Sequence, residues 1–272
     1  MQDALALVDG WPVPHAAAGV LDPNGTMHVR GDPDQPFPLA SVTKLLTAVA
    51  VLVATEEGSL DVDEPVPLPA GATARDLLCH ASGLAPEHDQ VVAPPRRRRN
   101  YSTRGYELLA EVVTARTRMP FDVYLREAVL EPLGMSATAL RGSAGSGAVS
   151  TVGDLLRFAV ALRRPQILSE ASLAAYATAQ FPALDGVLPG FGVQRPNPWG
   201  LGPEIRGVKS PHWTGTRNAP STHGHFGRAG TFLWIDPVAS ISAVVLTDRD
   251  FDDWARTAWP ELSDAIVASW VV

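Results

Sequence analysis

The sequence predicts an α+β fold in which a central antiparallel β-sheet is flanked by helices and carries an inserted all-helical domain. Two observations indicate this arrangement: strand-like runs lie near both ends of the 272-residue chain, and helical periodicity fills the middle. Hydrophobic residues make up 46% of the sequence and charged residues 19%, which is enough for a substantial core. We therefore expect one sheet interrupted by helices.

The first expected element is a β-hairpin within residues 15–31. Its two runs flank Asp22-Pro23-Asn24-Gly25, where proline fixes φ and glycine allows the positive φ of a tight turn. Helices follow, because apolar residues recur at helical spacing in residues 45–53, 106–113, 123–130 and 155–162. Residues 182–203 are rich in proline and glycine and are expected to form the return connection or a loop over the site.

A second hairpin is expected near the end of the chain. Residues 231–235 and 241–246 are rich in β-branched and aromatic side chains and are joined at Asp236-Pro237. Residues 252–271 then place apolar side chains on one side, which suits a helix lying across a sheet. We predict an α/β sheet domain formed by residues 1–38 and 186–272, a helical domain formed by residues 39–185, and an active site at their junction.

The charge and composition of the chain limit the classes of binding partner that are expected. A net charge of −7 argues against a general affinity for nucleic acid, so a small-molecule substrate is expected. Cys79 is the one cysteine and cannot form an intrachain disulfide. The N-terminus lacks a basic segment and a long apolar segment, and polar residues interrupt the apolar stretch at residues 37–54. We predict a cytoplasmic protein without a membrane partner, and we predict no particular oligomeric state.

Lys44 is the one charged residue in FPLASVTKLLTAVAVLVA, residues 37–54. Ser41 lies at the expected start of this apolar helix, where its hydroxyl can cap free backbone N–H groups. Capping does not explain Lys44, but residues three apart share a helix face, so the amine can lie beside the hydroxyl. Burial lowers the pKa of a lysine toward that of a general base, which could activate the serine. The alternative is a capping serine beside a lysine that reaches the surface.

Further motifs occur in an order that resembles a known family. Ser41 and Lys44 match S-x-x-K, and YSTRGY at residues 101–106 is similar to the pattern Y-S-N-x-G-Y. Together with HFG at residues 225–227, these motifs resemble the serine β-lactamases and penicillin-binding proteins, in particular the class C branch and its related esterases. The resemblance covers nearly the whole chain and implies the β-lactamase/transpeptidase-like fold, with no cofactor.

The resemblance assigns Tyr101 to the tyrosine that works with the lysine to move the serine's proton. A neighbouring ammonium group would favour the ionised form of such a phenol. Thr103 replaces the asparagine that contacts the lysine and the substrate in the family. A hydroxyl is shorter than an amide and cannot donate and accept in the same geometry, so Thr103 is a substrate-binding candidate that departs from the family.

HFG at residues 225–227 aligns with the family's K-T-G box and its H-T-G variant. The alignment is fixed because the residues that follow HFG also resemble those that follow this box in the family. The resemblance implies an oxyanion hole formed by the backbone N–H groups of Ser41 and Arg228 and substrate contacts at His225, Phe226 and Gly227. Phe226 replaces a hydroxyl-bearing residue, and an imidazole at position 225 is not a permanent cation. Both changes favour neutral esters or amides over β-lactams that carry a carboxylate.

Two other features remain outside the catalytic set. His80 lies in LLCHASGL, which resembles a loop signature of the family, and we expect it to brace loops. Residues 96–99 are four consecutive arginines directly before Asn100 and Tyr101. A charge run usually forms a solvated surface loop, but here it could also line the mouth of the site and attract anions.

Three functions remain open. The first is a serine hydrolase that acts on carboxylic esters or neutral amides through an acyl-serine intermediate. The second is a β-lactamase or D-alanyl peptidase with the same chemistry. The third is a non-catalytic, ligand-binding descendant of the family, suggested by Thr103 and Phe226. No metal site is predicted, because His223 and His225 lack an evident third ligand.

Overall fold

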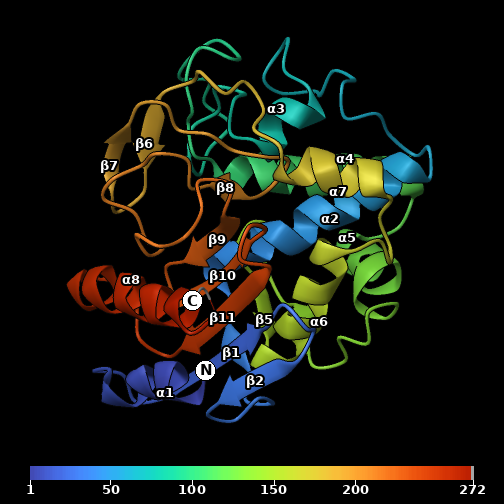
Figure 1. Ribbon diagram of the computed structural model, residues 1–272. Coiled ribbons are helices and arrows are strands. Elements are labelled where there is room, and N and C mark those ends of the chain that lie inside the picture. Colours follow the sequence, from blue (N-terminus) through green and yellow to red (C-terminus); the bar gives the residue numbers. More distant parts are fainter. Residues whose placement is uncertain (271–272) are drawn as a thin grey trace.

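The computed structural model describes residues 1–270 and contains a six-stranded antiparallel sheet with helices on both faces (Figure 1). The strands of this sheet are β1 (Ala16–Leu21), β2 (Met27–Arg30), β8 (Glu204–Ile205), β9 (His223–Gly227), β10 (Thr231–Asp236) and β11 (Ile241–Thr247). Their order is β2-β1-β11-β10-β9-β8. Strands from the two ends of the chain therefore form one sheet, as the sequence predicts.

Both predicted hairpins are confirmed. β1 pairs with β2 across a turn in which Gly25 has a φ of +83°, a value that favours glycine. β10 pairs with β11, and the side chain of Asp236 accepts hydrogen bonds from the N–H groups of Val238 and Ala239 at the turn. The local turn residues thus determine where each pair of strands reverses.

Alternate side chains of the strands enter different cores. Phe232 and Trp234 pack with Trp259 of α8 (Asp253–Ala268), whereas Leu233 and Ile235 belong to a core that also contains apolar residues of the helices in the middle of the chain. Figure 1 shows α8 on one side of the strands and α6 (Val152–Arg163) on the other. The predicted helix across the sheet is confirmed up to Ala268, and its predicted end at Val271 lies outside the described residues.

The middle of the chain is mainly helical. The remaining helices and turns are α1 (Gln2–Leu5), η1 (Ala6–Gly10), η2 (Ala40–Val42), α2 (Thr43–Glu56), α3 (Ala74–Leu78), α4 (Thr103–Thr117), α5 (Phe121–Leu125), η3 (Arg126–Leu130), α6 (Val152–Arg163) and α7 (Glu170–Ala177). The four stretches with helical spacing lie in α2, α4, α5 with η3, and α6. Within residues 1–270, no helix is long and apolar enough to cross a membrane.

Two small sheets complete the fold. β3 (Phe37–Pro38), β5 (Ala148–Ser150) and β4 (Ala139–Leu140) form one sheet, and β6 (Gly186–Leu188) pairs with β7 (Gly192–Gln194) in the other. The first sheet joins residues on both sides of the predicted domain boundary at residue 38, and the two-domain division remains a prediction. The β6–β7 hairpin lies within residues 182–203, where a return connection or a loop over the site is expected.

Candidate active site

Ser41 lies in the 3-10 turn η2, directly before α2. Its predicted capping role is wrong: the residue that caps α2 is Val42, and no side chain caps this helix. The cause is the 3-10 turn, which carries the chain into the helix without a free capping position at residue 41. Ala40 has a φ of +44°, a strained value for a residue with a Cβ, so the backbone is distorted immediately before the serine.

Lys44 is buried, and its amine is directed at the serine. Nζ lies 3.2 Å from Ser41 Oγ, 3.4 Å from Thr103 Oγ1 and 2.8 Å from the carbonyl oxygen of Gly145. Burial lowers the pKa of Lys44 to about 7, although Glu87 and Glu107 oppose this shift. An amine with this pKa is partly unprotonated near neutral pH and can accept the proton of Ser41. The alternative of a lysine that reaches the surface is wrong.

Gly145 is a functional residue that the sequence analysis missed. Its carbonyl group accepts a hydrogen bond from Lys44, and the neighbouring carbonyl of Ala144 accepts one from Thr47 Oγ1 at 2.6 Å. A Cβ at Gly145 would lie 2.7 Å from Thr103 Cγ2, so this close approach requires glycine. The glycine-rich run RGSAGSG at residues 141–147 is the one signal that could have indicated a backbone in close contact with the site.

Tyr101 lies against both Lys44 and His225. Lys44 Nζ is 4.8 Å from the centre of the Tyr101 ring, and the phenolic oxygen is 3.4 Å from His225 Nε2. Burial raises the pKa of Tyr101, and a hydrogen bond with Ser41 offsets this only in part. The expectation that the ammonium group favours the ionised phenol is therefore wrong, because desolvation outweighs it. Tyr101 is neutral near pH 7 and can relay a proton, but Lys44 is the better base.

Thr103 begins α4, whose N-cap is the side chain of Ser102. The Thr103 hydroxyl reaches Lys44, so it retains a contact with the lysine although it is shorter than an asparagine amide. Thr103 also lines the cavity that contains Ser41. This position is compatible with the predicted substrate contact.

His225 projects from β9 toward Tyr101. Its Nδ1 lies 2.6 Å from the carbonyl oxygen of Phe226, which can only accept, so Nδ1 carries the hydrogen. Nε2 is then free to accept a hydrogen bond from the Tyr101 hydroxyl. Burial, together with the charge of Lys44, lowers the pKa of His225 to about 3. The imidazole is therefore neutral and presents no cation to a substrate carboxylate.

The end of β9 lies against the backbone that leads to Ser41. A Cβ at Gly227 would be 2.3 Å from the carbonyl oxygen of Leu39, and Thr231 Oγ1 donates a hydrogen bond of 2.9 Å to that same oxygen. This close approach brings the Arg228 backbone toward Ser41, while the Arg228 side chain is exposed. Their pairing as an oxyanion hole remains a prediction.

His80 braces the chain beside the site, as expected. Its Nδ1 accepts a hydrogen bond of 3.1 Å from the N–H group of Ser102, and its ring packs 4.5 Å from that of Tyr101, centre to centre. Burial lowers the pKa of His80 well below its usual value, so the ring is neutral. This histidine positions Tyr101 rather than acting on a substrate.

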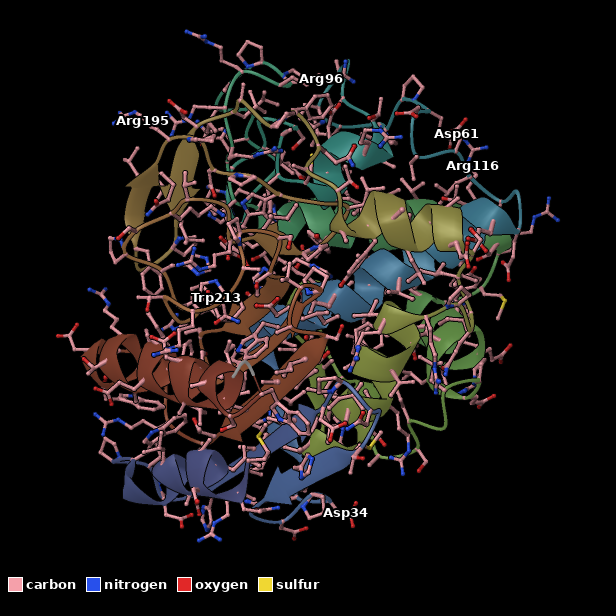
Figure 2. The ribbon with its side chains drawn as sticks, in the orientation of Figure 1. Asp34, Asp61, Arg96, Arg116, Arg195 and Trp213 are labelled. Atoms are coloured by element: carbon pink, nitrogen blue, oxygen red, sulfur yellow. The ribbon has the colours of Figure 1, made fainter. Side chains whose placement is uncertain are left out.

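Two of the four arginines at residues 96–99, Arg98 and Arg99, line the cavity, so the run as a whole is not a common anion-attracting rim. Arg96 lies on a loop at the edge of the molecule (Figure 2) and pairs with the buried carboxylate of Asp76 at 2.9 Å. Arg99 is only 1% exposed. Its guanidinium group donates to the backbone carbonyl groups of Cys79, Gln180, Phe181 and Asn197. Carbonyl groups from separate segments thus surround Arg99, which explains why a charge run contains a buried side chain.

The predicted site residues other than Lys44 and Gly227 line a cavity of about 660 Å3. Ser41, Tyr101, Thr103, His225, Phe226 and Arg228 line it, whereas Lys44 lies behind Ser41. Within residues 1–270, no group of three or more histidine, cysteine, aspartate or glutamate side chains is arranged to hold a metal ion. The cavity presents the Ser41 hydroxyl and the Tyr101 phenol to a ligand, and the amine of Lys44 lies behind the serine.

Comparison with known proteins agrees with this geometry. A profile described as Beta-lactamase matches residues 4–267. A structure described as a β-lactamase from Mycobacterium bovis is 53% identical, covers 99% of this chain and 100% of its own, and superimposes with a TM-score of 0.97. The search of curated proteins gave no match.

More distant structures share the fold. Simvastatin synthase from Aspergillus terreus superimposes with a TM-score of 0.82 at 19% identity, covering 99% of this chain and 94% of its own. A penicillin-binding protein from Bacillus halodurans gives a TM-score of 0.78 at 18% identity, with 98% of both chains covered. These likenesses extend the shared architecture over the whole chain. The protein therefore belongs to the β-lactamase family of serine enzymes and has the β-lactamase/transpeptidase-like fold.

Proposed function

We propose that this protein is a serine hydrolase that cleaves uncharged carboxylic esters or neutral amides through an acyl-serine intermediate. The observation that carries this proposal is the buried amine of Lys44, which lies 3.2 Å from Ser41 Oγ. Membership of the β-lactamase family supports a serine hydrolase-type enzyme in general. The choice of uncharged substrates rests on residues 225 and 226.

The proposed reaction has two steps. Ser41 Oγ attacks the carbonyl carbon while its proton passes to Lys44, and the proton then reaches the departing alcohol or amine. Water then attacks the resulting acyl-serine ester and gives a proton to Lys44. The bond between the acyl carbon and Ser41 Oγ breaks, Lys44 returns the proton to Ser41 Oγ, and the carboxylic acid leaves. Tyr101, whose ring centre lies 4.8 Å from Lys44 Nζ, would relay the proton to the leaving group. The backbone N–H groups of Ser41 and Arg228 would stabilise the negative oxygen in both steps.

Uncharged substrates fit the HFG motif at residues 225–227 best. His225 is neutral because its pKa is about 3, and Phe226 offers no hydroxyl group. A substrate carboxylate would therefore lose solvation at this strand without gaining a cation from residue 225 or a hydroxyl donor from residue 226. A neutral ester or amide does not incur this cost.

A β-lactamase or D-alanyl peptidase is the second candidate. It is favoured by the Mycobacterium bovis structure, which is 53% identical and is described as a β-lactamase. The two candidates share Ser41 and Lys44 and differ in the substrate that positions 225 and 226 accept. A measurement with both classes of substrate separates them.

Intact-mass measurement after mixing with p-nitrophenyl acetate, and separately with penicillin G, tests these proposals. We expect an acetyl adduct with the ester, no adduct with the penicillin, and neither adduct in Ser41→Ala. Ser136→Ala is the matched control, because it removes an exposed hydroxyl that does not line the cavity. A penicillin adduct would favour the second candidate. No adduct and no turnover with either compound would favour the non-catalytic, ligand-binding descendant.

A further inference from the structure

The cavity beyond Ser41 has an apolar wall built from segments that lie far apart in the sequence. One part comes from the loop before the arginine run, one from the β6–β7 hairpin, and one from the region of β9 and the chain after β11. The residues are Val92, Val187, Leu188, Pro189, Phe226 and Phe251. A volume of about 660 Å3 is within the range of small-molecule sites and exceeds what attack on a short ester requires.

This wall continues to the surface as exposed apolar side chains. Val92 is 51% exposed and Val187 is 45% exposed, and both line the cavity. The neighbouring Val91 is 46% exposed. Apolar residues that gather at the mouth of a cavity mark a binding surface more often than scattered ones do. The apolar surface thus extends from the serine to the solvent.

Charges deep in the cavity are already paired. The guanidinium group of Arg99 is bound to backbone carbonyl groups. Glu204 accepts hydrogen bonds from Lys209, His212 and Trp213. The other charged residues that line the cavity, Glu87, Arg98 and Arg228, are exposed. A ligand in the interior therefore meets apolar side chains and no unpaired charge.

The wall is also held in place before any ligand binds. The backbone N–H group of Arg99 donates a hydrogen bond of 2.7 Å to the backbone carbonyl oxygen of Asp185, and a Cβ at Gly186 would lie 2.4 Å from Arg99 Cβ. Figure 1 shows the β6–β7 hairpin at the periphery, on the same side of the molecule as α3. Arg99, whose guanidinium group is bound to four backbone carbonyl groups, fixes the base of this hairpin, so the wall requires little ordering on binding.

We propose that this wall binds a hydrocarbon chain, so that the substrate is an uncharged ester whose acyl group is a chain of several carbons. The inference rests on the proposed hydrolase activity of Ser41 and adds the substrate class. Each methylene group that enters an apolar site gains enough free energy to raise kcat/KM about fourfold. The preference therefore increases with chain length until the cavity is full.

A series of p-nitrophenyl esters from acetate to decanoate tests the inference. We expect kcat/KM to rise about fourfold per methylene group between butanoate and octanoate. Val187→Asp should lower the octanoate-to-acetate ratio of kcat/KM at least tenfold. The matched control is Val193→Asp, because Val193 is 55% exposed and faces Val187 across the hairpin but does not line the cavity. This control should leave the ratio within about twofold of the original.

A second measurement keeps the inference separate from catalysis. Octanamide and butanamide are uncharged, and their binding to Ser41→Ala can be measured by calorimetry. We expect octanamide to bind at least 100-fold more tightly, because it adds four methylene groups. If p-nitrophenyl acetate is turned over but kcat/KM does not change with the length of the acyl chain, the inference is overturned and the hydrolase proposal still stands. Equal binding of the two amides would also overturn it, whereas tight octanamide binding without ester turnover would support the chain site and remove the hydrolase proposal.

Discussion

The pH dependence of acylation follows from the buried position of Lys44. Burial lowers its pKa to about 7, and only the neutral amine can accept the proton of Ser41. The acylation rate should therefore increase with pH, reach half its maximum near pH 7 and level off above pH 8. At pH 5 only about 1% of the amine is neutral, so the rate should be about 100-fold below its maximum. A lysine with the usual pKa of 10.5 would instead give a rate that still increases at pH 9.

Glu87 offers a way to move this inflection without touching the lysine. Its carboxylate raises the pKa of Lys44 because it favours the charged amine. Glu87→Gln should therefore shift the inflection to lower pH and increase the relative rate at pH 6. Glu111→Gln is the matched control, because Glu111 is exposed and pairs with Arg104 rather than acting on Lys44.

The assay is the burst of p-nitrophenol in a stopped-flow instrument, measured with p-nitrophenyl acetate between pH 5 and pH 9. The burst reports acylation separately from release of the acyl group, and Ser41→Ala should show none. An inflection above pH 9, or a profile that is flat from pH 5 to pH 9, would refute the role of Lys44 as the base. An unchanged inflection in Glu87→Gln would refute the electrostatic explanation.

Three further predictions concern stability and the oxyanion site. Arg99→Met should lower the free energy of unfolding in urea by about 3 kcal/mol or more, because buried carbonyl groups lose their donors. The control is Arg97→Met, which alters an exposed side chain and should change this free energy by less than about 0.5 kcal/mol. Gly227→Ala should lower kcat about 100-fold in ester hydrolysis, because the new Cβ would lie 2.3 Å from the carbonyl oxygen of Leu39. The control is Gly10→Ala, whose Cβ would meet open space and which should leave kcat unchanged. Lys44→Met should increase the free energy of unfolding in urea at pH 7 by up to about 5 kcal/mol. This magnitude follows from the cost of burying the amine, which lowers its pKa from 10.5 to about 7. The sign follows from protonation: between these two values only the unfolded chain holds the proton, so the wild type gains stability as pH rises and the advantage of the variant should shrink by pH 10.

Local chemistry explains why much of the fold could be predicted. The turn residues between β1 and β2 and between β10 and β11 set the hairpins, and alternating side chains assign each strand two faces. The spacing of Ser41 and Lys44 also placed the amine beside the hydroxyl correctly, since three residues make nearly one helical turn. These features depend on neighbours within a few residues.

Features that depend on distant partners could not be predicted in the same way. The sequence around Ser41 is consistent with a helix cap, and neither the 3-10 turn nor the positive φ of Ala40 leaves a compositional signal. Gly145 reaches Lys44 through its carbonyl group, which every residue possesses. Arg99 is buried because backbone from other segments satisfies it, whereas a run of arginines by itself indicates a surface. Side-chain type is informative about local geometry but not about backbone partners supplied by other segments.

The pairing of β1 with β11 has a consequence for how the protein folds. These neighbouring strands lie near opposite ends of the chain, with Ala16 facing Thr247, so the sheet has high contact order and cannot be completed early in synthesis. Ser41 and Lys44 leave the ribosome before β9, which lies against the turn that carries Ser41 and is made about 180 residues later. A nascent chain therefore carries Ser41 long before it carries the strand whose following N–H group is proposed to stabilise the oxyanion, and the proposed site can be completed only after β9 has been made.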